Sequence, residues 1–141
     1  MTSCELCEKT GGEVLWQDAF CRVILVDDQD YPGFCRVIWL DHIKEMSDLT
    51  TVQQNRLMRV VFAVEAAIRD TLKPDKINLA SLGNVVPHLH WHVIPRFKDD
   101  KHFPNPIWGE AQRASTTNKD KNLIASVLPC VSSSKGRCVK D

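Results

Sequence analysis

Three of the five histidines occupy alternate positions in one short run, His88-Leu89-His90-Trp91-His92-Val93-Ile94. Successive side chains of a β-strand point to opposite faces of its sheet, so this run predicts a strand with all three imidazoles on one face. Leu89, Trp91 and Val93 would then face the core. Such a strand is stable only when other strands pair with it and another layer covers its apolar face. The run therefore predicts a sheet with a polar row of histidines on one side and a hydrophobic core on the other.

Four further runs of residues have the composition of strands. β-Branched and aromatic residues, which favour strands, are enriched in residues 14–16, 19–26, 34–40 and 77–82. The Asp, Pro and Gly residues within 27–33 predict a turn between the second and third of these runs. Together with the histidine run, these segments predict five strands.

A single long helix is predicted before the fourth of these runs. Thr50 and Gln53 have the spacing of a capping box, and apolar residues recur at intervals of three and four from Leu57 to Leu72. Pro74 lacks the backbone N–H that a helix needs and disfavours helical geometry in the residue before it. The helix should therefore end near Leu72, and the whole pattern predicts an α+β fold.

The length of 141 residues suits one domain followed by a tail. Hydrophobic residues make up 43% of the chain, which is enough for a packed core. Residues 114–141 are rich in Ser, Thr and Lys, with five basic and two acidic side chains. A segment of this composition buries too little apolar surface to offset the entropy of ordering it. We therefore expect a domain over residues 1–113 and a poorly ordered extension over residues 114–141.

Charge and cysteine content argue against several classes of protein. Eighteen basic and eighteen acidic residues leave no net charge, so neither nucleic acid nor an anionic membrane is an expected partner. The most apolar stretch, 60–68, is interrupted by Glu65 and is shorter than a bilayer span of ~20 residues. The polar N-terminus lacks the apolar run of a signal peptide, which predicts a cytoplasmic protein. Disulfides are then not expected, and Cys21 and Cys35, inside apolar runs, should be buried thiols.

The histidine run is compatible with three kinds of site. It could be a half-exposed strand that uses histidine on its wet side, or a metal site, because imidazole is a common neutral ligand. The third interpretation is nucleophilic catalysis, in which one imidazole attacks while its neighbours orient it and assist the leaving group.

The run resembles a known signature. Residues 88–94 match the His-φ-His-φ-His-φ-φ pattern of the histidine triad family of nucleotide hydrolases and transferases, where φ is apolar. Pro32-Gly33 before a strand, Asp41-His42-Ile43 after it and the long helix that follows are also similar to the family, and the run 78–96 is particularly like its bacterial members. The resemblance extends over about residues 4–112. It implies a five-stranded antiparallel sheet with one long helix and a short second helix, and a homodimer in which two sheets join.

The resemblance also implies roles for the three histidines. His90 would attack the α-phosphorus of a nucleotide and form a covalent nucleotidyl-imidazole intermediate that water then hydrolyses. His92 would contact the phosphate and assist the leaving group, while His88 would support the site. Such chemistry suits a neutral imidazole near pH 7 and requires no divalent metal.

Residues outside the histidine run have less specific roles. By their positions in the family, Asn78 would contact ribose and Asn84 phosphate, although Asn84 after Gly83 also suits an ordinary turn. Asp28 would contact a ribose hydroxyl or lie solvated in its turn. Trp108 would either cover the base or leaving group or only pack, and His102, in a charged loop, is expected to be solvated.

Cys4 and Cys7 form a Cys-x-x-Cys pair. The resemblance points to His42 and His88 as two further ligands, which would complete the four that a structural zinc needs. Such a zinc would be structural, because His90 must keep its lone pair free for catalysis. The alternative is a pair of free thiols at the N-terminus.

The first functional hypothesis is therefore an enzyme that cleaves at a nucleotide α-phosphate. Its substrate would be an adenine or guanine nucleotide, either a dinucleoside polyphosphate such as diadenosine tetraphosphate or a nucleoside phosphoramidate. The alternatives are a non-catalytic dimeric nucleotide-binding protein and a zinc-binding scaffold. Retention of a nucleophile at His90 favours the enzyme, because a protein that only binds has no need of one.

Overall fold

The computed structural model describes residues 3–115 of the chain. In chain order its elements are α1 (Glu5–Glu8), β1 (Glu13–Gln17), β2 (Cys21–Leu25), β3 (Cys35–Trp39), a 3-10 turn η1 (Met46–Asp48), α2 (Thr51–Leu72), β4 (Lys76–Ala80) and β5 (His90–Arg96). The five strands form one antiparallel sheet in the order β1-β2-β3-β5-β4. The predicted α+β fold with five antiparallel strands and one long helix is confirmed.

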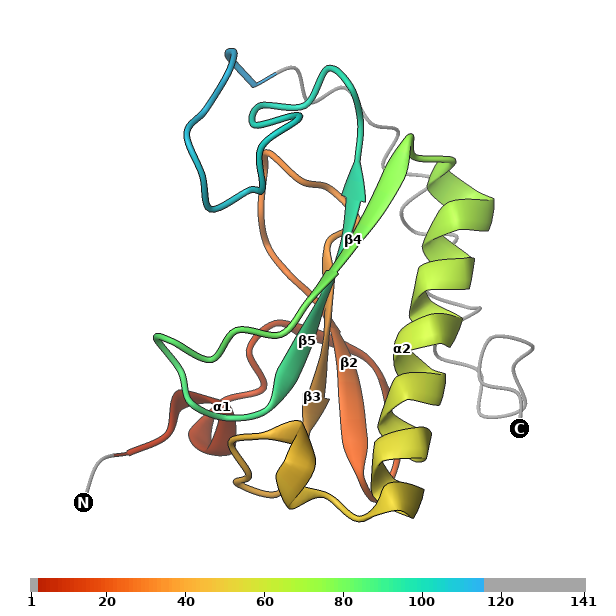
Figure 1. Cartoon of the computed structure of the whole chain (residues 1–141), viewed down its shortest axis with the longest axis vertical. Helices are drawn as coiled ribbons and strands as arrows, with labels where there is room; N and C mark the ends of the chain where they lie inside the picture. The colour runs from red at the N-terminus through yellow and green to blue at the C-terminus, as the bar shows by residue number, and fades with distance from the viewer. Residues whose placement is uncertain (1–2, 116–141) are drawn as a thin grey trace.

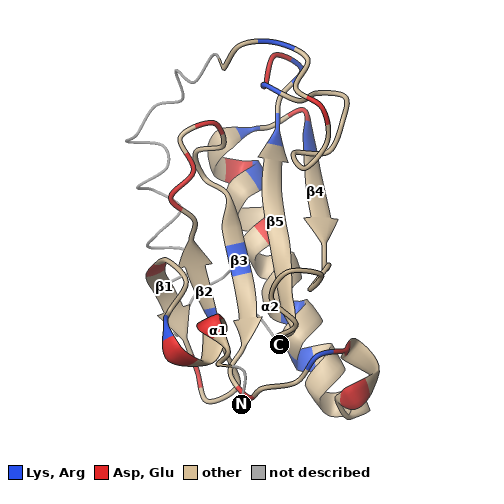
Figure 2. Ribbon diagram, turned by 90° about the vertical axis from the view of Figure 1, so that its left-hand side faces the viewer, with Lys and Arg blue, Asp and Glu red and all other residues tan. Residues whose placement is uncertain are grey.

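The long helix α2 covers one face of the sheet (Figure 1). Its apolar stripe packs against the residues of β3 and β5 that point towards it, and the buried thiols lie at the sheet, as predicted. The central members of this core are Cys21, Val23, Cys35, Val37, Leu57, Val60, Val61, Val64, Ile68 and Val93. Because side chains alternate along a strand, the residues between these core positions point to the opposite face of the sheet. Figure 2 views the sheet from that opposite side.

Both ends of α2 lie where the sequence predicts them. The Thr50 hydroxyl accepts a hydrogen bond from the N–H of Gln53, and the Gln53 side chain accepts one from the N–H of Thr50. Such a capping box satisfies two N–H groups that the first turn leaves unpaired. At the other end Lys73 adopts the left-handed conformation, with φ of 49°, directly after Leu72. The helix thus ends before Pro74.

The strand boundaries differ by one or two residues from the sequence prediction, and two of these differences lie next to the histidines. Strand β4 covers 76–80 instead of 77–82, because the chain leaves the sheet at Ser81. Strand β5 begins at His90 and not at His88. The backbone N–H of His88 instead donates to Val86, and that of Leu89 donates to Ile43. His88 is therefore outside the strand that carries the other two histidines.

Only two residues of the extension predicted over 114–141, Ala114 and Ser115, lie among the described residues. Its poor order stays a prediction. No helix within residues 3–115 is both long enough and apolar enough to cross a membrane.

Candidate active site and metal centre

Strand β5 places His90 and His92 side by side on the face of the sheet away from α2. The neighbouring strand β3 pairs Ile38 with His90 and Arg36 with His92. The ring centroids of the two histidines are 4.9 Å apart. His90 is 8% exposed and His92 is 4% exposed. The predicted row of histidines is therefore buried, because loops outside the sheet cover it.

The hydrogen bond of His90 determines which of its nitrogens is free. Its Nδ1 lies 2.5 Å from the carbonyl oxygen of His88. A carbonyl can only accept, so Nδ1 carries the hydrogen and Nε2 of the neutral ring keeps a lone pair. Burial lowers the pKa of His90 below its ordinary value, partly offset by the bond to His88. At neutral pH His90 is thus an uncharged imidazole with a nucleophilic Nε2.

His92 has the opposite arrangement. The Nε of Arg36 donates a long hydrogen bond of 3.4 Å to Nδ1 of His92. Because Nδ1 accepts, the hydrogen of the neutral ring is on Nε2. Burial, followed by the charges of His90 and Arg36, lowers the pKa of His92 to about 3. His92 is therefore a neutral hydrogen-bond donor at physiological pH.

Both imidazoles line a cavity of about 530 Å³, together with Arg36, Asn84 and Trp108. The ring of Trp108 lies edge-on to His92, with centroids 4.9 Å apart, and remains 49% exposed. Trp108 is therefore a wall of the cavity, and its role in covering a base or leaving group stays a prediction. Asn84 reaches the same cavity from the turn that follows Gly83, whose φ is +80°. A cavity of this size falls within the range of small-molecule sites.

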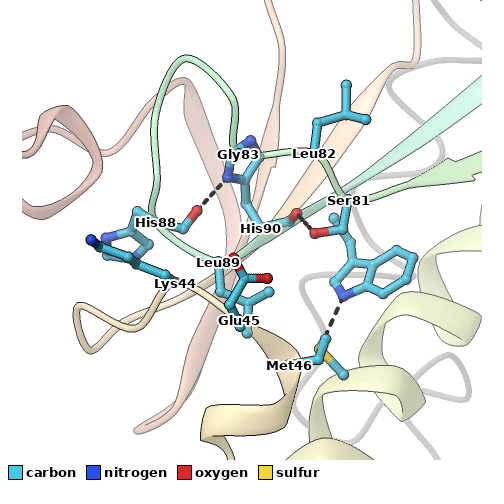
Figure 3. Close-up of a pocket in the computed structure, with 10 residues that line it drawn as sticks. Lys44, Glu45, Met46, Ser81, Leu82, Gly83, His88, Leu89 and His90 are labelled. Carbon is cyan, nitrogen blue, oxygen red and sulfur yellow. Dashed lines mark hydrogen bonds between the residues drawn. The ribbon is translucent and has the colours of Figure 1, made fainter.

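A second cavity, of about 250 Å³, lies beside His90 and is bounded by the segment that follows β3 (Figure 3). The Ser81 hydroxyl donates to the carbonyl oxygen of His90 over 2.8 Å. The indole N–H of Trp91 donates to the sulfur of Met46. Together with the bond between His88 and His90, these contacts fix the first residue of β5 and hold its imidazole in one orientation.

Two residues with proposed nucleotide contacts lie outside the 530 Å³ cavity. The Oδ1 of Asn78 accepts a hydrogen bond of 2.7 Å from Nη1 of Arg96. The Oδ1 of Asp28 accepts one of 2.9 Å from the backbone N–H of Asp30. The Oδ1 atom of each side chain is thus engaged within the protein, and neither residue lines the cavity of the two histidines.

A buried ion pair anchors the segment that carries Trp108. The Nε and Nη2 of Arg96 donate to the two carboxylate oxygens of Asp100 over 2.8 and 3.0 Å. Burial alone would raise the pKa of Asp100, but the hydrogen bonds from Arg96 and from backbone N–H groups outweigh it and lower the pKa to about 2. His102 is only partly exposed and not fully solvated as predicted, because its Nδ1 lies 2.6 Å from the hydroxyl of Tyr31.

The four residues assigned to zinc come together from three separate segments. The ligand atoms of Cys4, Cys7, His42 and His88 all lie within 4.8 Å of one another. Sulfur-to-Nδ1 distances are 3.3 and 3.4 Å to His88 and 3.5 Å to His42. With bonds of about 2.3 Å to sulfur and about 2.0 Å to nitrogen, ligands of a tetrahedral zinc lie about 3.5 Å apart. The donor set and its spacing therefore fit zinc.

His88 belongs to this metal group and not to the row formed by His90 and His92. Its Nε2 lies 2.5 Å from the carbonyl oxygen of Trp39 and donates to it, which leaves the Nδ1 lone pair facing the two thiols. The sequence prediction of three imidazoles on one strand face is wrong at this residue. His88 acts on His90 through its backbone carbonyl, and its imidazole faces the cysteines.

Arg36 is the residue of the site that sequence reasoning missed. The signal was available, because a charged residue interrupts the apolar run of residues 34–40. The strand register alone decides that Arg36 lies opposite His92.

Comparison with known proteins agrees with this architecture. The sequence profile of the HIT domain matches residues 9–99. The chain belongs to the HIT domain family. A histidine triad protein from Bradyrhizobium japonicum has 30% sequence identity and a TM-score of 0.72, over 90% of this chain and 94% of that structure. One from Marinobacter aquaeolei has 28% identity and a TM-score of 0.72, over 91% and 93%.

Curated relatives of this HIT protein include enzymes named for diadenosine polyphosphates. An "AP-4-A phosphorylase" of Mycobacterium tuberculosis is 26% identical over 101 residues, which are 67% of this chain and 52% of the relative. A "Bis(5'-adenosyl)-triphosphatase" of Saccharomyces cerevisiae is 33% identical over 73 residues, 48% of this chain and 35% of the relative. The chain therefore matches about half or less of the length of these relatives.

Proposed function

We propose that this HIT protein is a nucleotide hydrolase that cleaves at the α-phosphate through a nucleotide covalently bound to His90. The observation that carries the proposal is the hydrogen bond between His90 Nδ1 and the carbonyl of His88, which leaves Nε2 free beside a cavity. The names of the curated relatives support a dinucleoside polyphosphate as the substrate. A nucleoside phosphoramidate is the second candidate substrate.

The reaction has two steps at one phosphorus atom. The lone pair of His90 Nε2 forms a bond to the α-phosphorus, and the bond from that phosphorus to the bridging oxygen breaks. The bonding pair leaves with this oxygen on the released nucleotide. The modified ring is cationic, and the His88 carbonyl that accepts from Nδ1 stabilises it. Water then attacks the same phosphorus, the N–P electron pair returns to Nε2, and a proton passes to solvent.

His92 and Asn84 would serve this chemistry by hydrogen bonding. The Nε2–H of His92 is available to a phosphate oxygen, because Nδ1 already accepts from Arg36. The amide of Asn84 reaches the same cavity from its turn and is assigned to phosphate. Fixed donors of this kind stabilise charge that develops on phosphoryl oxygens. Neither Asn78 nor Asp28 takes part in these steps.

We propose that Cys4, Cys7, His42 and His88 hold a structural zinc ion. A bound zinc would tie the N-terminus to the sheet and fix the backbone of His88, whose carbonyl orients His90. The zinc ion takes no part in the proposed catalytic steps, which use only residues of the protein.

The homodimer implied by the resemblance is also a proposal. Strand β4 forms one edge of the sheet and has backbone groups open to pairing. Light scattering that gives the mass of two chains would support the dimer, and a mass of one chain at all concentrations would contradict it.

Trapping the covalent intermediate tests the main proposal. Wild-type protein mixed with diadenosine tetraphosphate and quenched into base should carry a nucleotidyl group on the peptide that contains His90, because such an adduct is stable to base. His90→Ala should form no adduct and lose turnover by at least about 1,000-fold. His102→Gln, which alters a histidine outside the cavity, should still form the adduct. An adduct on another residue, or turnover by His90→Ala, would show that the nucleophile is wrong.

The products decide between water and phosphate as the acceptor. Hydrolysis of diadenosine tetraphosphate yields AMP and ATP, whereas attack by inorganic phosphate yields ADP and ATP. The second outcome would make this protein a phosphorylase, as the name of the M. tuberculosis relatives indicates for them. Nucleotide binding without turnover of either substrate class would support the alternative of a non-catalytic binding protein.

A further inference from the structure

A positive charge lies in the middle of the sheet, and no residue in the described part of the chain forms a salt bridge with it. Figure 2 shows basic colour within β3, whose sequence Cys-Arg-Val-Ile-Trp contains one basic residue, Arg36. Arg36 is half-buried and pairs with Ile24 on one side and His92 on the other. Among residues 3–115 no carboxylate forms a salt bridge with it. Burial lowers the pKa of Arg36, and the negative charges of Glu5 and Asp28 raise it from a distance.

The guanidinium has hydrogen-bond donors left over. Its Nε donates to His92, and its central carbon lies 5.5 Å from the ring centre of Phe34. Neither terminal nitrogen has a hydrogen-bond partner within residues 3–115. Neither is sealed in the core, since the only fully buried side-chain nitrogen or oxygen without a partner in this part of the chain is Nε1 of Trp39. Arg36 lines the cavity of His90 and His92, so these N–H groups open towards it.

Burying a charge without a partner costs free energy, which a ligand of opposite charge can offset. A planar guanidinium with two free NH2 groups matches the oxygens of a phosphate, and arginine is protonated at neutral pH. Of the acidic residues that the structure describes, only Glu5 lines the same cavity. Arg36 is therefore suited to bind an anionic phosphate group.

We propose that Arg36 binds the phosphates beyond the α-phosphate and so selects an anionic polyphosphate leaving group over a neutral amine. The inference rests on the proposed function and specifies its substrate class. As the bond from phosphorus to the bridging oxygen breaks, the electron pair moves onto that oxygen beside the guanidinium. The leaving phosphate is stable as an anion and needs no proton.

A phosphoramidate makes a different demand on the same site. When its P–N bond breaks, the electron pair moves onto nitrogen, which must gain a proton to leave as an amine. Arg36 does not give up its proton, and the low pKa of His92 leaves little imidazolium near neutral pH. The arrangement therefore stabilises a charged leaving group better than it protonates a basic one.

Binding measurements test the assignment without chemistry. In the full-length His90→Ala background, ADP should bind at least about tenfold more tightly than AMP, a typical effect of one charged hydrogen-bonded contact. Adding Arg36→Leu should remove this difference while changing AMP affinity less than about threefold. Equal loss of AMP and ADP affinity would place Arg36 at the α-phosphate and overturn the proposal, as would an unchanged preference for ADP.

Turnover measurements provide a second test of the role of Arg36. Arg36→Leu should lower kcat/KM for diadenosine tetraphosphate by about 100-fold and for adenosine phosphoramidate by less than about tenfold. Arg36→Lys keeps the charge and should lie between the wild type and Arg36→Leu. Arg69→Leu removes an equal charge from the exposed end of α2 and should match the wild type. Equal losses on both substrates would show that Arg36 only positions His92, and overturn the proposal.

The two failures are distinguishable. If the wild type turns over neither substrate, the proposed hydrolase is wrong, and the AMP and ADP affinities still decide the role of Arg36. If the wild type forms the His90 adduct but the substrate preference of Arg36→Leu is unchanged, the hydrolase stands and the assignment of Arg36 fails.

Discussion

His90 and His92 are the same residue type two positions apart, yet their hydrogen-bond partners give them opposite tautomers. The His88 carbonyl accepts from Nδ1 of His90, whereas the Arg36 guanidinium donates to Nδ1 of His92. One ring therefore keeps a lone pair on Nε2 and the other carries an N–H there. A ring with a free lone pair and a ring with a free N–H thus stand side by side in one cavity.

Stability should depend on pH through His92. Its pKa is lowered to about 3 in the folded protein, chiefly by burial, against about 6.5 in the unfolded chain. Between these values only the unfolded chain binds the proton. The contribution of His92 to stability is therefore complete above about pH 6.5 and is lost as the pH falls towards 3, at up to about 1.4 kcal/mol per pH unit.

Chemical denaturation at pH 7 and pH 5 measures this effect. The free energy of unfolding should fall less between the two pH values in His92→Gln than in the wild type. An equal fall in both proteins would show that His92 is not held neutral in the folded state.

At the scale of the element, the segment 97–113 is ordered by polar contacts. Asp100 holds Arg96 through two hydrogen bonds, and Arg113 donates to the carbonyls of Asp100 and Phe103. This framework keeps Trp108 against His92. A loop that forms one wall of the cavity thus depends on an ion pair at the end of β5.

Asp100→Ala should lower the free energy of unfolding by about 3 to 5 kcal/mol, because it leaves the guanidinium of Arg96 buried without a carboxylate to balance its charge. Chemical denaturation would measure the loss. Asp70→Ala, which removes an exposed carboxylate from α2, is the control and should change stability by less than about 0.5 kcal/mol. A loss in Asp100→Ala as small as that of the control would contradict the structural role of the pair.

The start of α2 offers a smaller test. Thr50→Ala removes the hydroxyl that accepts from the N–H of Gln53 and should cost about 1 kcal/mol in unfolding free energy. Thr51→Ala, one residue later and outside the cap, should be close to neutral. Similar losses in the two variants would mean that the capping box adds no stability.

At the scale of the whole molecule, the N-terminal segment connects the candidate zinc ligands to the sheet. The Arg22 side chain donates to the carbonyls of Leu6, Lys9 and Thr10, and Leu6 packs against Ile24 and Ile38. These contacts bring the Cys-x-x-Cys pair to two histidines that are 35 to 84 residues away along the chain.

Zinc removal should therefore destabilise the protein. Elemental analysis should find about one zinc per chain in the wild type and less than a tenth of that in the Cys4→Ser, Cys7→Ser double variant. The variant should also unfold at a lower temperature, since a zinc ion bound to these residues would link three distant segments. A matched double variant at Cys21 and Cys35, the buried thiols away from the group, should keep its zinc if it folds. Full metal content in the Cys4, Cys7 variant would refute the site.

The C-terminal extension should be dispensable. Removal of residues 114–141 should leave the melting temperature and turnover unchanged, because its composition offers too little apolar surface to pack. A large fall in melting temperature on truncation would contradict this.

The sequence by itself determined the local features. Capping residues and Pro74 set the ends of α2, and alternation along the chain placed Leu89 and Val93 in the core. These features depend on neighbours a few residues apart, so their chemistry can be read along the chain. The histidine signature also identified the family.

Only the tertiary structure decided how distant side chains meet. His88 leaves the strand and turns to the cysteines, Asn78 engages Arg96, and Arg36 lies against a histidine 56 residues away. No periodicity in the sequence encodes these contacts, because they depend on the register between strands and on loops that fold back over the sheet. A one-residue shift of β3 against β5 would turn Arg36 to the other face, so the charge in the candidate active site is a property of the assembled sheet.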